Sequence, residues 1–193
     1  MQRDLTNGCV LKNITLFSLP YFLSYFLQTL YGLADLFIIG QFDGVDSITA
    51  VSIGSQIMHM ITVMIVGLSM GATVCIAQAV GAKDKEKLRY CIGNTVTVFF
   101  IVSLILTGLL LFYTDFIVGV VKTPTEAVAG TKEYLIICFI GIPLITAYNI
   151  VSSILRGMGD SKSPMYFIAI ACVANIILDY VFIGYFKLGA VGA

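Results

Sequence analysis

The chain has 193 residues, of which 59% are hydrophobic and only 11% are charged, and its formal net charge at pH 7 is zero. Soluble domains carry about 25% charged residues, so this composition excludes an ordinary soluble protein and indicates a membrane protein whose surroundings are the lipid bilayer. The lack of net positive charge argues against a nucleic-acid partner held by bulk electrostatic attraction.

Five apolar stretches are long enough to cross a bilayer, which takes about 20 mostly apolar residues. In chain order they are residues 14–40, 48–80, 91–113, 134–155 and 164–186. Continuous apolar runs of this length satisfy their backbone hydrogen bonds only as helices. The sequence therefore predicts an all-α, polytopic transmembrane helix bundle of five spans, and residues 187–193 are expected to be a turn that starts a sixth.

The basic residues predict the orientation of the bundle, because cytoplasmic loops carry an excess of Lys and Arg. Eight of the 11 basic residues fall on one side of the membrane: Arg3, Lys12, Lys83, Lys85, Lys87, Arg89, Arg156 and Lys162. The other side has Lys122, Lys132 and Lys187. This asymmetry predicts a cytoplasmic N-terminus, with the first, third and fifth spans running outward.

Two carboxylates, Asp35 and Asp179, lie inside the apolar stretches. An ionised Asp at the centre of a bilayer costs roughly 2.5–3.5 kcal/mol on insertion scales, so both are candidates for function. Each lies five or six residues from the predicted outer end of its helix, which places both about 8–9 Å below the surface. The alternative is that each carboxylate only hydrogen-bonds a neighbouring helix.

Asn175 lies one helical turn before Asp179 and shares its face. Tyr134 begins the fourth span, which enters from the outer side, so its hydroxyl is expected to reach the same level. Oxygen ligands of this kind suit a hard cation such as Na⁺, and paired carboxylates suit the storage of a proton. The sequence therefore predicts a cation or proton site formed by Asp35, Tyr134, Asn175 and Asp179.

Other residues are less specific. Gln28 lies two turns from Asp35 and is expected to face the same cavity. Pro20 is expected to kink the first helix, either as a moving part or as a static bend. The single histidine, His59, is expected to be packed and neutral, the glycines of the stretch 67–71 to mediate helix packing, and the five cysteines to act as small apolar residues.

Three stretches resemble the multidrug and toxic compound extrusion (MATE) family: "LADLFIIGQFDGVDSITAVSIG" at 33–54, "RGMGDSKSPM" at 156–165 and "NIILDYVFI" at 175–183. The loop "AQAVGAKDKEK" also fits, and the resemblance covers essentially the whole chain. It implies one lobe of a two-lobed antiporter of twelve helices that exports drugs in exchange for Na⁺ or H⁺.

The resemblance also implies roles for individual residues. Asp35, Asn175, Asp179 and Tyr134 match the family's cation site in the N-terminal lobe. Gln28 matches a substrate-facing position, and Pro20 matches the proline at which the first helix bends. A helix-six hydroxyl of that site would lie beyond Ala193. The chain is therefore expected to be a partial N-terminal lobe that lacks its C-terminal lobe, in the inner membrane of a bacterium.

Two other functions compete with drug efflux. A flippase for lipid-linked oligosaccharides would share the fold, but such proteins tend to line the cavity with basic residues, and here no Lys or Arg lies deep in a span. A membrane-embedded enzyme is the other alternative. The sequence shows no nucleophile–base pair and no metal-ligand cluster, so an enzyme is not expected, and neither is a resident cofactor.

Overall fold

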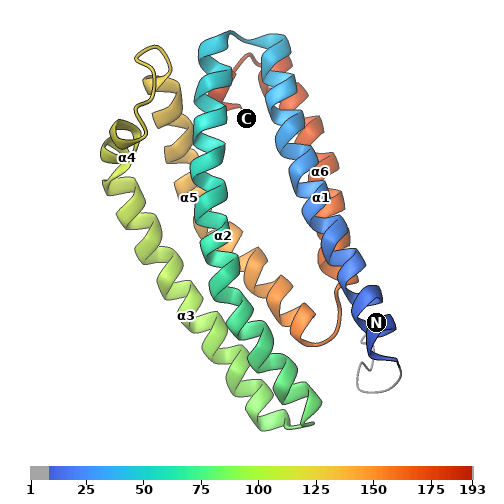
Figure 1. Ribbon diagram of the computed structural model, residues 1–193. Helices are drawn as coiled ribbons and strands as arrows, with labels where there is room; N and C mark the ends of the chain where they lie inside the picture. Colours follow the sequence, from blue (N-terminus) through green and yellow to red (C-terminus); the bar gives the residue numbers. More distant parts are fainter. Residues whose placement is uncertain (1–8, 193) are drawn as a thin grey trace.

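The computed structural model describes residues 9–192, which are helical almost throughout and contain no strand. Figure 1 shows the arrangement of the helices. Their bounds are α1 Val10–Phe42, α2 Val45–Gly81, α3 Lys85–Phe112, α4 Thr114–Val120, α5 Val128–Gly157 and α6 Lys162–Asp179, followed by a π-helix η1 at Tyr180–Tyr185 and a 3₁₀-helix η2 at Gly189–Val191.

Five of these helices are long and apolar enough to cross a membrane, namely α1, α2, α3, α5, and α6 continued by η1. The predicted all-α polytopic bundle is thereby confirmed. The helices extend beyond most of the predicted spans. The predicted spans end where charged residues lower the hydropathy, whereas the helices continue until their backbone hydrogen bonds stop. The beginning of α5 shows this best, since it starts at Val128 and includes Lys132 and Glu133. The short α4 was not predicted.

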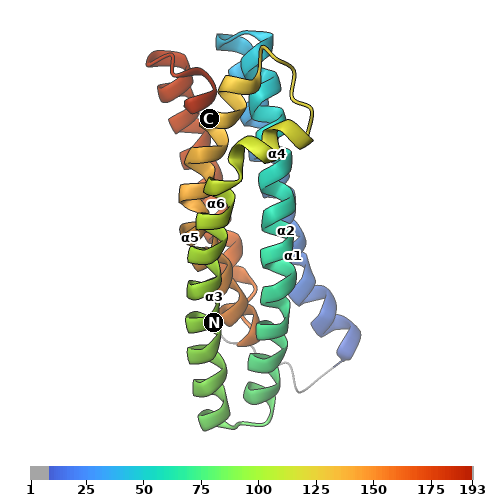
Figure 2. The same cartoon turned by 90° about the vertical axis from the view of Figure 1, so that its left-hand side faces the viewer.

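The helices form two groups. α1 packs mainly against α6, and α2 packs mainly against α5, with α3 beside both α2 and α5. In Figure 1 the α1–α6 pair runs along one side of the bundle, while in Figure 2 the antiparallel pair α2–α3 faces the viewer with α4 across its end. The two groups meet most closely at the end where α1 turns into α2.

Two clusters of buried apolar side chains hold the bundle together. The first joins α1, α2 and the end of the chain, and the second joins α2 to α4 and α5. The first contains Ile38, Ile39, Ala50, Val51, Ala127, Ile183 and Ala190, and the second contains Met58, Ile61, Ile65, Val118, Leu135, Phe139 and Ile142. Tyr134 packs against both clusters, so it lies at the junction between them.

The turn between α5 and α6 is fixed by local chemistry. Gly159 has a φ of 87°, in the left-handed region that favours glycine. Asp160 then accepts hydrogen bonds from the backbone N–H groups of Lys162 and Ser163, at 3.0 and 3.1 Å, and from the Ser163 hydroxyl at 2.6 Å. These bonds satisfy amide groups that the first turn of α6 leaves without a helical partner. Asp160 therefore caps the start of α6.

Close helix contacts occur at glycines other than those expected. A Cβ added at Gly54 would overlap the ring of Tyr134, and one added at Gly157 would lie 2.8 Å from the side chain of Ile76. A Cβ added at Gly67 or Gly71 would meet no atom within 4 Å. The expectation that residues 67–71 mediate packing is therefore wrong for these two glycines within the described chain; Gly71 instead lines an open groove between α2 and α3.

One pair of cysteines also departs from the expectation. Cys75 of α2 and Cys91 of α3 form a disulfide with a Cα–Cα distance of 6.4 Å, within the range usual for such bonds. Cys138 and Cys172 are free, and only the latter is buried as a small apolar residue would be. The reason is the antiparallel hairpin of α2 and α3, which brings the residues on either side of its turn together.

Pro20 lies inside α1 without ending it, and the Ser24 hydroxyl donates a hydrogen bond of 2.8 Å to the Pro20 carbonyl. A different irregularity follows Asp179, where η1 begins. The Phe186 N–H donates to the Val181 carbonyl, five residues back, instead of four as in an α-helix. Arg3, one of the basic residues used to predict orientation, lies outside the described part of the chain.

Candidate functional site

The two membrane carboxylates come from the paired helices α1 and α6. The Asp35 carboxyl of α1 interacts directly with the Asp179 carboxyl and with the Asn175 amide, both of α6. Asn175 and Asp179 are one turn apart and therefore project from the same face of α6. Asp179 is only 2% exposed, so the group lies inside the bundle rather than in a loop. The structure thus brings three of the predicted site residues together.

Three oxygen atoms of this group are buried and have no hydrogen-bond partner among residues 9–192: Oδ1 of Asp35, Oδ1 of Asn175 and Oδ2 of Asp179. A buried polar atom left without a partner costs about 1–3 kcal/mol, and more when it is charged. Such a cost is explained if a ligand supplies the missing interactions. Carboxylate and amide oxygens are the ligands that hard cations prefer, and a proton shared between the carboxylates would serve as well.

Tyr134 approaches the same group from α5. Its ring lies against Gly54 of α2, and its hydroxyl is 3.0 Å from the Ser55 hydroxyl. The phenol also interacts electrostatically with Asp35 and with Cys138, one turn further along α5. Tyr134 therefore lies within electrostatic reach of Asp35 while bonded to α2. Sequence reasoning missed Ser55, since a serine in an apolar helix usually bonds to its own backbone.

Gln28 lies elsewhere. It lines a cavity of about 40 Å³ together with residues of α1, α2, α5 and α6, and neither Asp35 nor Asp179 is among them. The polar lining consists of Tyr21, Ser24, Tyr25, Gln28, His59, Thr62, Tyr148, Asn149 and Arg156. At one end the Arg156 guanidinium lies 5.2 Å from the centre of the Tyr21 ring. The structure therefore does not place Gln28 in one cavity with the carboxylates.

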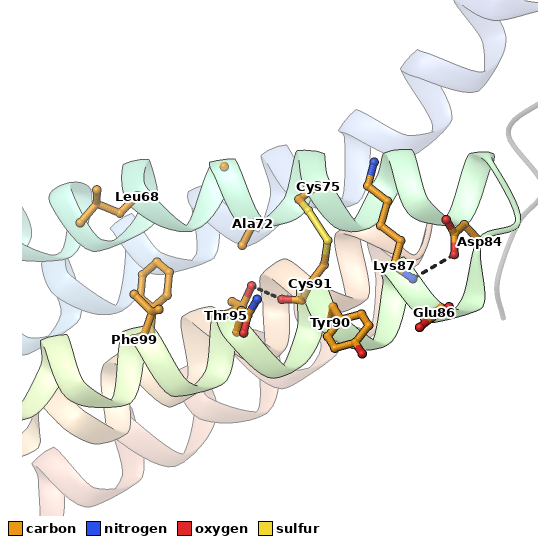
Figure 3. Close-up of a pocket in the computed structure, with 13 residues that line it drawn as sticks. Leu68, Ala72, Cys75, Asp84, Glu86, Lys87, Tyr90, Cys91, Thr95 and Phe99 are labelled. Atoms are coloured by element: carbon orange, nitrogen blue, oxygen red, sulfur yellow. Dashed lines mark hydrogen bonds between the residues drawn. A yellow bond between two sulfur atoms is a disulfide. The ribbon is translucent and has the colours of Figure 1, made fainter.

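An open groove of about 700 Å³ lies between α2 and α3, around the disulfide (Figure 3). Cys75 and Cys91 lie across it, and Asp84 accepts a hydrogen bond of 2.9 Å from the backbone N–H of Lys87 at the start of α3. None of the predicted site residues lines this groove. It is separate from the carboxylate group.

Two similar curated proteins are named as probable multidrug resistance proteins. The chain is 33% identical over 190 residues to the "Probable multidrug resistance protein YpnP" of Bacillus subtilis, covering 98% of the chain and 43% of that protein. It is 30% identical over 187 residues to the "Probable multidrug resistance protein NorM" of Thermotoga maritima, covering 94% of the chain and 40% of that protein. The chain therefore spans about two fifths of the length of these curated relatives.

Two solved transporter structures are also similar to this chain. A transporter described as "MATE in the bent conformation" superposes with a TM-score of 0.89 at 30% identity, covering 96% of this chain and 41% of that one. A transporter of the same superfamily from Pyrococcus furiosus superposes with a TM-score of 0.88 at 30% identity, covering 97% and 41%. The MatE family model matches residues 20–181. The chain accordingly belongs to the MATE family of multi-pass membrane transporters and is not an enzyme.

Proposed function

We propose that this chain is the N-terminal lobe of a multidrug efflux antiporter and that Asp35, Asn175 and Asp179 bind its coupling ion. The observation that carries the proposal is the set of three buried oxygens on facing positions of α1 and α6 that have no hydrogen-bond partner in the described part of the chain. The relatives named as multidrug resistance and export proteins support efflux as the activity. The second lobe of the same transporter would then be the lobe's main protein partner.

Antiport requires only that drug and ion favour different arrangements of the lobe. A coupling free energy of about 1–3 kcal/mol between the two ligands changes the affinity for either about 5- to 150-fold. Entry of Na⁺ or H⁺ neutralises charge between α1 and α6, which alters the repulsion between their carboxylates. The packing of these two helices would therefore respond to the ion, and a drug that prefers the other packing would be released.

In the proposed orientation the N-terminus is cytoplasmic and the carboxylates lie in the outer leaflet of the inner membrane. Organic compounds, often cationic, are the expected cargo, and Na⁺ or H⁺ is the only further ligand expected. Gln28 and its small cavity, and the bend at Pro20, would contribute to cargo contact and to movement of α1.

A flippase for lipid-linked oligosaccharides remains the alternative. The Pyrococcus transporter is described as having a binding pocket of reverse polarity that "suggests different function", so a difference in function within this superfamily is a reason to keep the alternative. Phosphate-bearing lipids would need basic side chains in the cavity. In the small cavity beside Gln28, Arg156 is the single Lys or Arg among the described lining residues. Its guanidinium lies over the Tyr21 ring and donates to the Ser153 hydroxyl at 3.3 Å. One arginine engaged in this way is not a cluster of basic side chains, which favours drug efflux.

The test uses the complete transporter in proteoliposomes, with export of a fluorescent organic cation driven by a Na⁺ gradient or a pH gradient imposed separately. Asp35→Asn and Asp179→Asn should each lower ion-driven export at least about 10-fold, as expected for loss of an ion–drug coupling of this size. Asp115→Asn is the control, since Asp115 is exposed and pairs with Lys132 outside the carboxylate group. Full export by either variant would remove that carboxylate from the mechanism.

A further inference from the structure

Two neighbouring residues of α2 hold the ring of Tyr134. Gly54 allows the ring to lie directly on the α2 backbone, since a side chain there would overlap it. Ser55 then meets the phenol hydroxyl at 3.0 Å. Because Tyr134 also packs against both apolar clusters, its ring is confined on several sides while its hydroxyl has a polar contact on α2.

The hydrogen bond between Ser55 and Tyr134 differs from most hydroxyl bonds in the described chain. Ser69 of the same helix donates to the Val66 carbonyl at 2.9 Å, which is a bond within its own helix. Ser55 instead bonds to a side chain 79 residues away, on α5. A half-buried hydroxyl that bonds to a side chain of another helix fixes the relative position of two side chains, whereas a hydroxyl bonded to its own helix backbone fixes only its own side chain.

We propose that Ser55 is a positioning residue of the ion site: its hydrogen bond across the α2–α5 contact holds the phenol of Tyr134 beside Asp35. This inference rests on the proposed function, in which the carboxylates bind the coupling ion. When the phenol donates its proton to Ser55, the lone pairs of its oxygen are free to face a cation or a protonated carboxyl. Ser55 thereby determines both where the phenol oxygen lies and which way its lone pairs point.

The same bond links the ion site to the packing of α2 on α5. Asp35 and Asp179 lie on the α1–α6 pair, whereas Ser55 and Tyr134 lie on the other group of helices. Tyr134 and Cys138, one turn apart on α5, are the side chains of that group with which Asp35 interacts electrostatically. An ion bound between the carboxylates would therefore affect the α2–α5 group through a phenol whose position Ser55 sets.

The test measures ion dependence in proteoliposomes of the complete transporter. Ser55→Ala should raise the Na⁺ or H⁺ concentration for half-maximal export about 2- to 10-fold, the effect of one neutral hydrogen bond, with little change in the KM for drug. Ser55→Thr retains the hydroxyl and should restore the wild-type ion dependence. Ser69→Ala, on the same helix, is the matched control and should leave it unchanged. Tyr134→Phe combined with Ser55→Ala should be no worse than Tyr134→Phe alone, because Ser55 acts through the phenol.

A second readout is independent of transport. The ¹³Cζ NMR signal of Tyr134, assigned by its loss in Tyr134→Phe, should shift in Ser55→Ala and return in Ser55→Thr. An unchanged signal and unchanged ion dependence in Ser55→Ala would overturn the inference. If Asp35→Asn abolishes export while Tyr134→Phe exports with normal ion dependence, the inference fails and the proposed function stands. If Asp35→Asn exports normally, the proposed function fails and the inference with it.

Discussion

Gly157 lies where α5 and α2 approach most closely near the α5–α6 turn, and replacing it with Ala should separate the two helices. An added Cβ would lie 2.8 Å from Cβ and Cγ2 of Ile76 and 2.9 Å from the Thr73 carbonyl oxygen. Carbon atoms in favourable contact are about 3.5–4.0 Å apart, so one helix would have to move by about 0.7–1.2 Å. Ile76 is completely buried, which leaves its side chain no open space to enter.

The expected cost has two parts. Overpacking a well-packed contact costs about 1–3 kcal/mol. The movement would also stretch the 3.3 Å hydrogen bond from the Thr73 hydroxyl to the Ser153 carbonyl, which joins the same two helices and contributes about 0.5–1.5 kcal/mol. Because Gly157 is the last residue of α5, Ala gains little helix propensity there. We expect Gly157→Ala to lower the free energy of unfolding by about 2–3 kcal/mol.

The measurement is reversible unfolding of the protein in mixed micelles with increasing SDS, followed by helicity. Gly141→Ala, in the same helix, is the matched control, because its added Cβ would meet no atom within 4 Å. That change should leave stability unaltered or raise it by up to about 1 kcal/mol through helix propensity. If Gly157→Ala unfolded at the same SDS fraction as the wild type, the result would contradict the close approach of α2 and α5 at Ile76.

Two further predictions concern the loops. Burial of Asp160 disfavours its charge, but its hydrogen bonds with Ser163 and with the amide of Lys162 outweigh this and hold its pKa below the ordinary value. Asp160→Ala should therefore destabilise the protein by about 1–2 kcal/mol at neutral pH. Because the folded pKa is lowered, this contribution is present above about pH 4 and is lost as the pH falls through the folded pKa, so the variant and the wild type should converge in acid. Cysteines placed at residues 43–47, where α1 turns into α2, should react with an impermeant thiol reagent in intact cells. Reaction at residues 83–87, where α2 turns into α3, would instead reverse the proposed orientation.

The sequence predicted the five membrane-spanning helices because each contains a long run of mostly apolar residues. It did not predict α4, because seven residues with one carboxylate resemble any connecting loop. The disulfide was also missed, although Cys75 and Cys91 stand at equal distances from Lys83, whose positive φ marks the turn. Residues equidistant from the turn of an antiparallel hairpin face one another, so the spacing was a usable signal.

For the candidate site, the presence of polar residues inside apolar segments was sufficient to single out Asp35, Asn175 and Asp179. Their meeting could be anticipated from equal depth alone. The position of Ser55 could not, because it depends on how closely α2 crosses α5, and that distance is set by Gly54 and the Tyr134 ring rather than by any local pattern. Gln28 shows the limit of such spacing: two turns along a helix keep a residue on roughly the same face but at a different depth, and Gln28 lines a small cavity with His59, so its contact with a substrate stays a prediction.

The π-helix that follows Asp179 changes the direction in which side chains project from the last part of this membrane span. A turn closed by a bond to the fifth residue back inserts an extra residue, so every side chain beyond it is rotated relative to those before it. Asn175 and Asp179 stand before this insertion, while Ile183, 1% exposed, and Gly184, packed near the Phe42 ring, stand after it. Gain or loss of one residue at this point would therefore rotate the surface that carries Asn175 and Asp179 relative to the packing at the helix end.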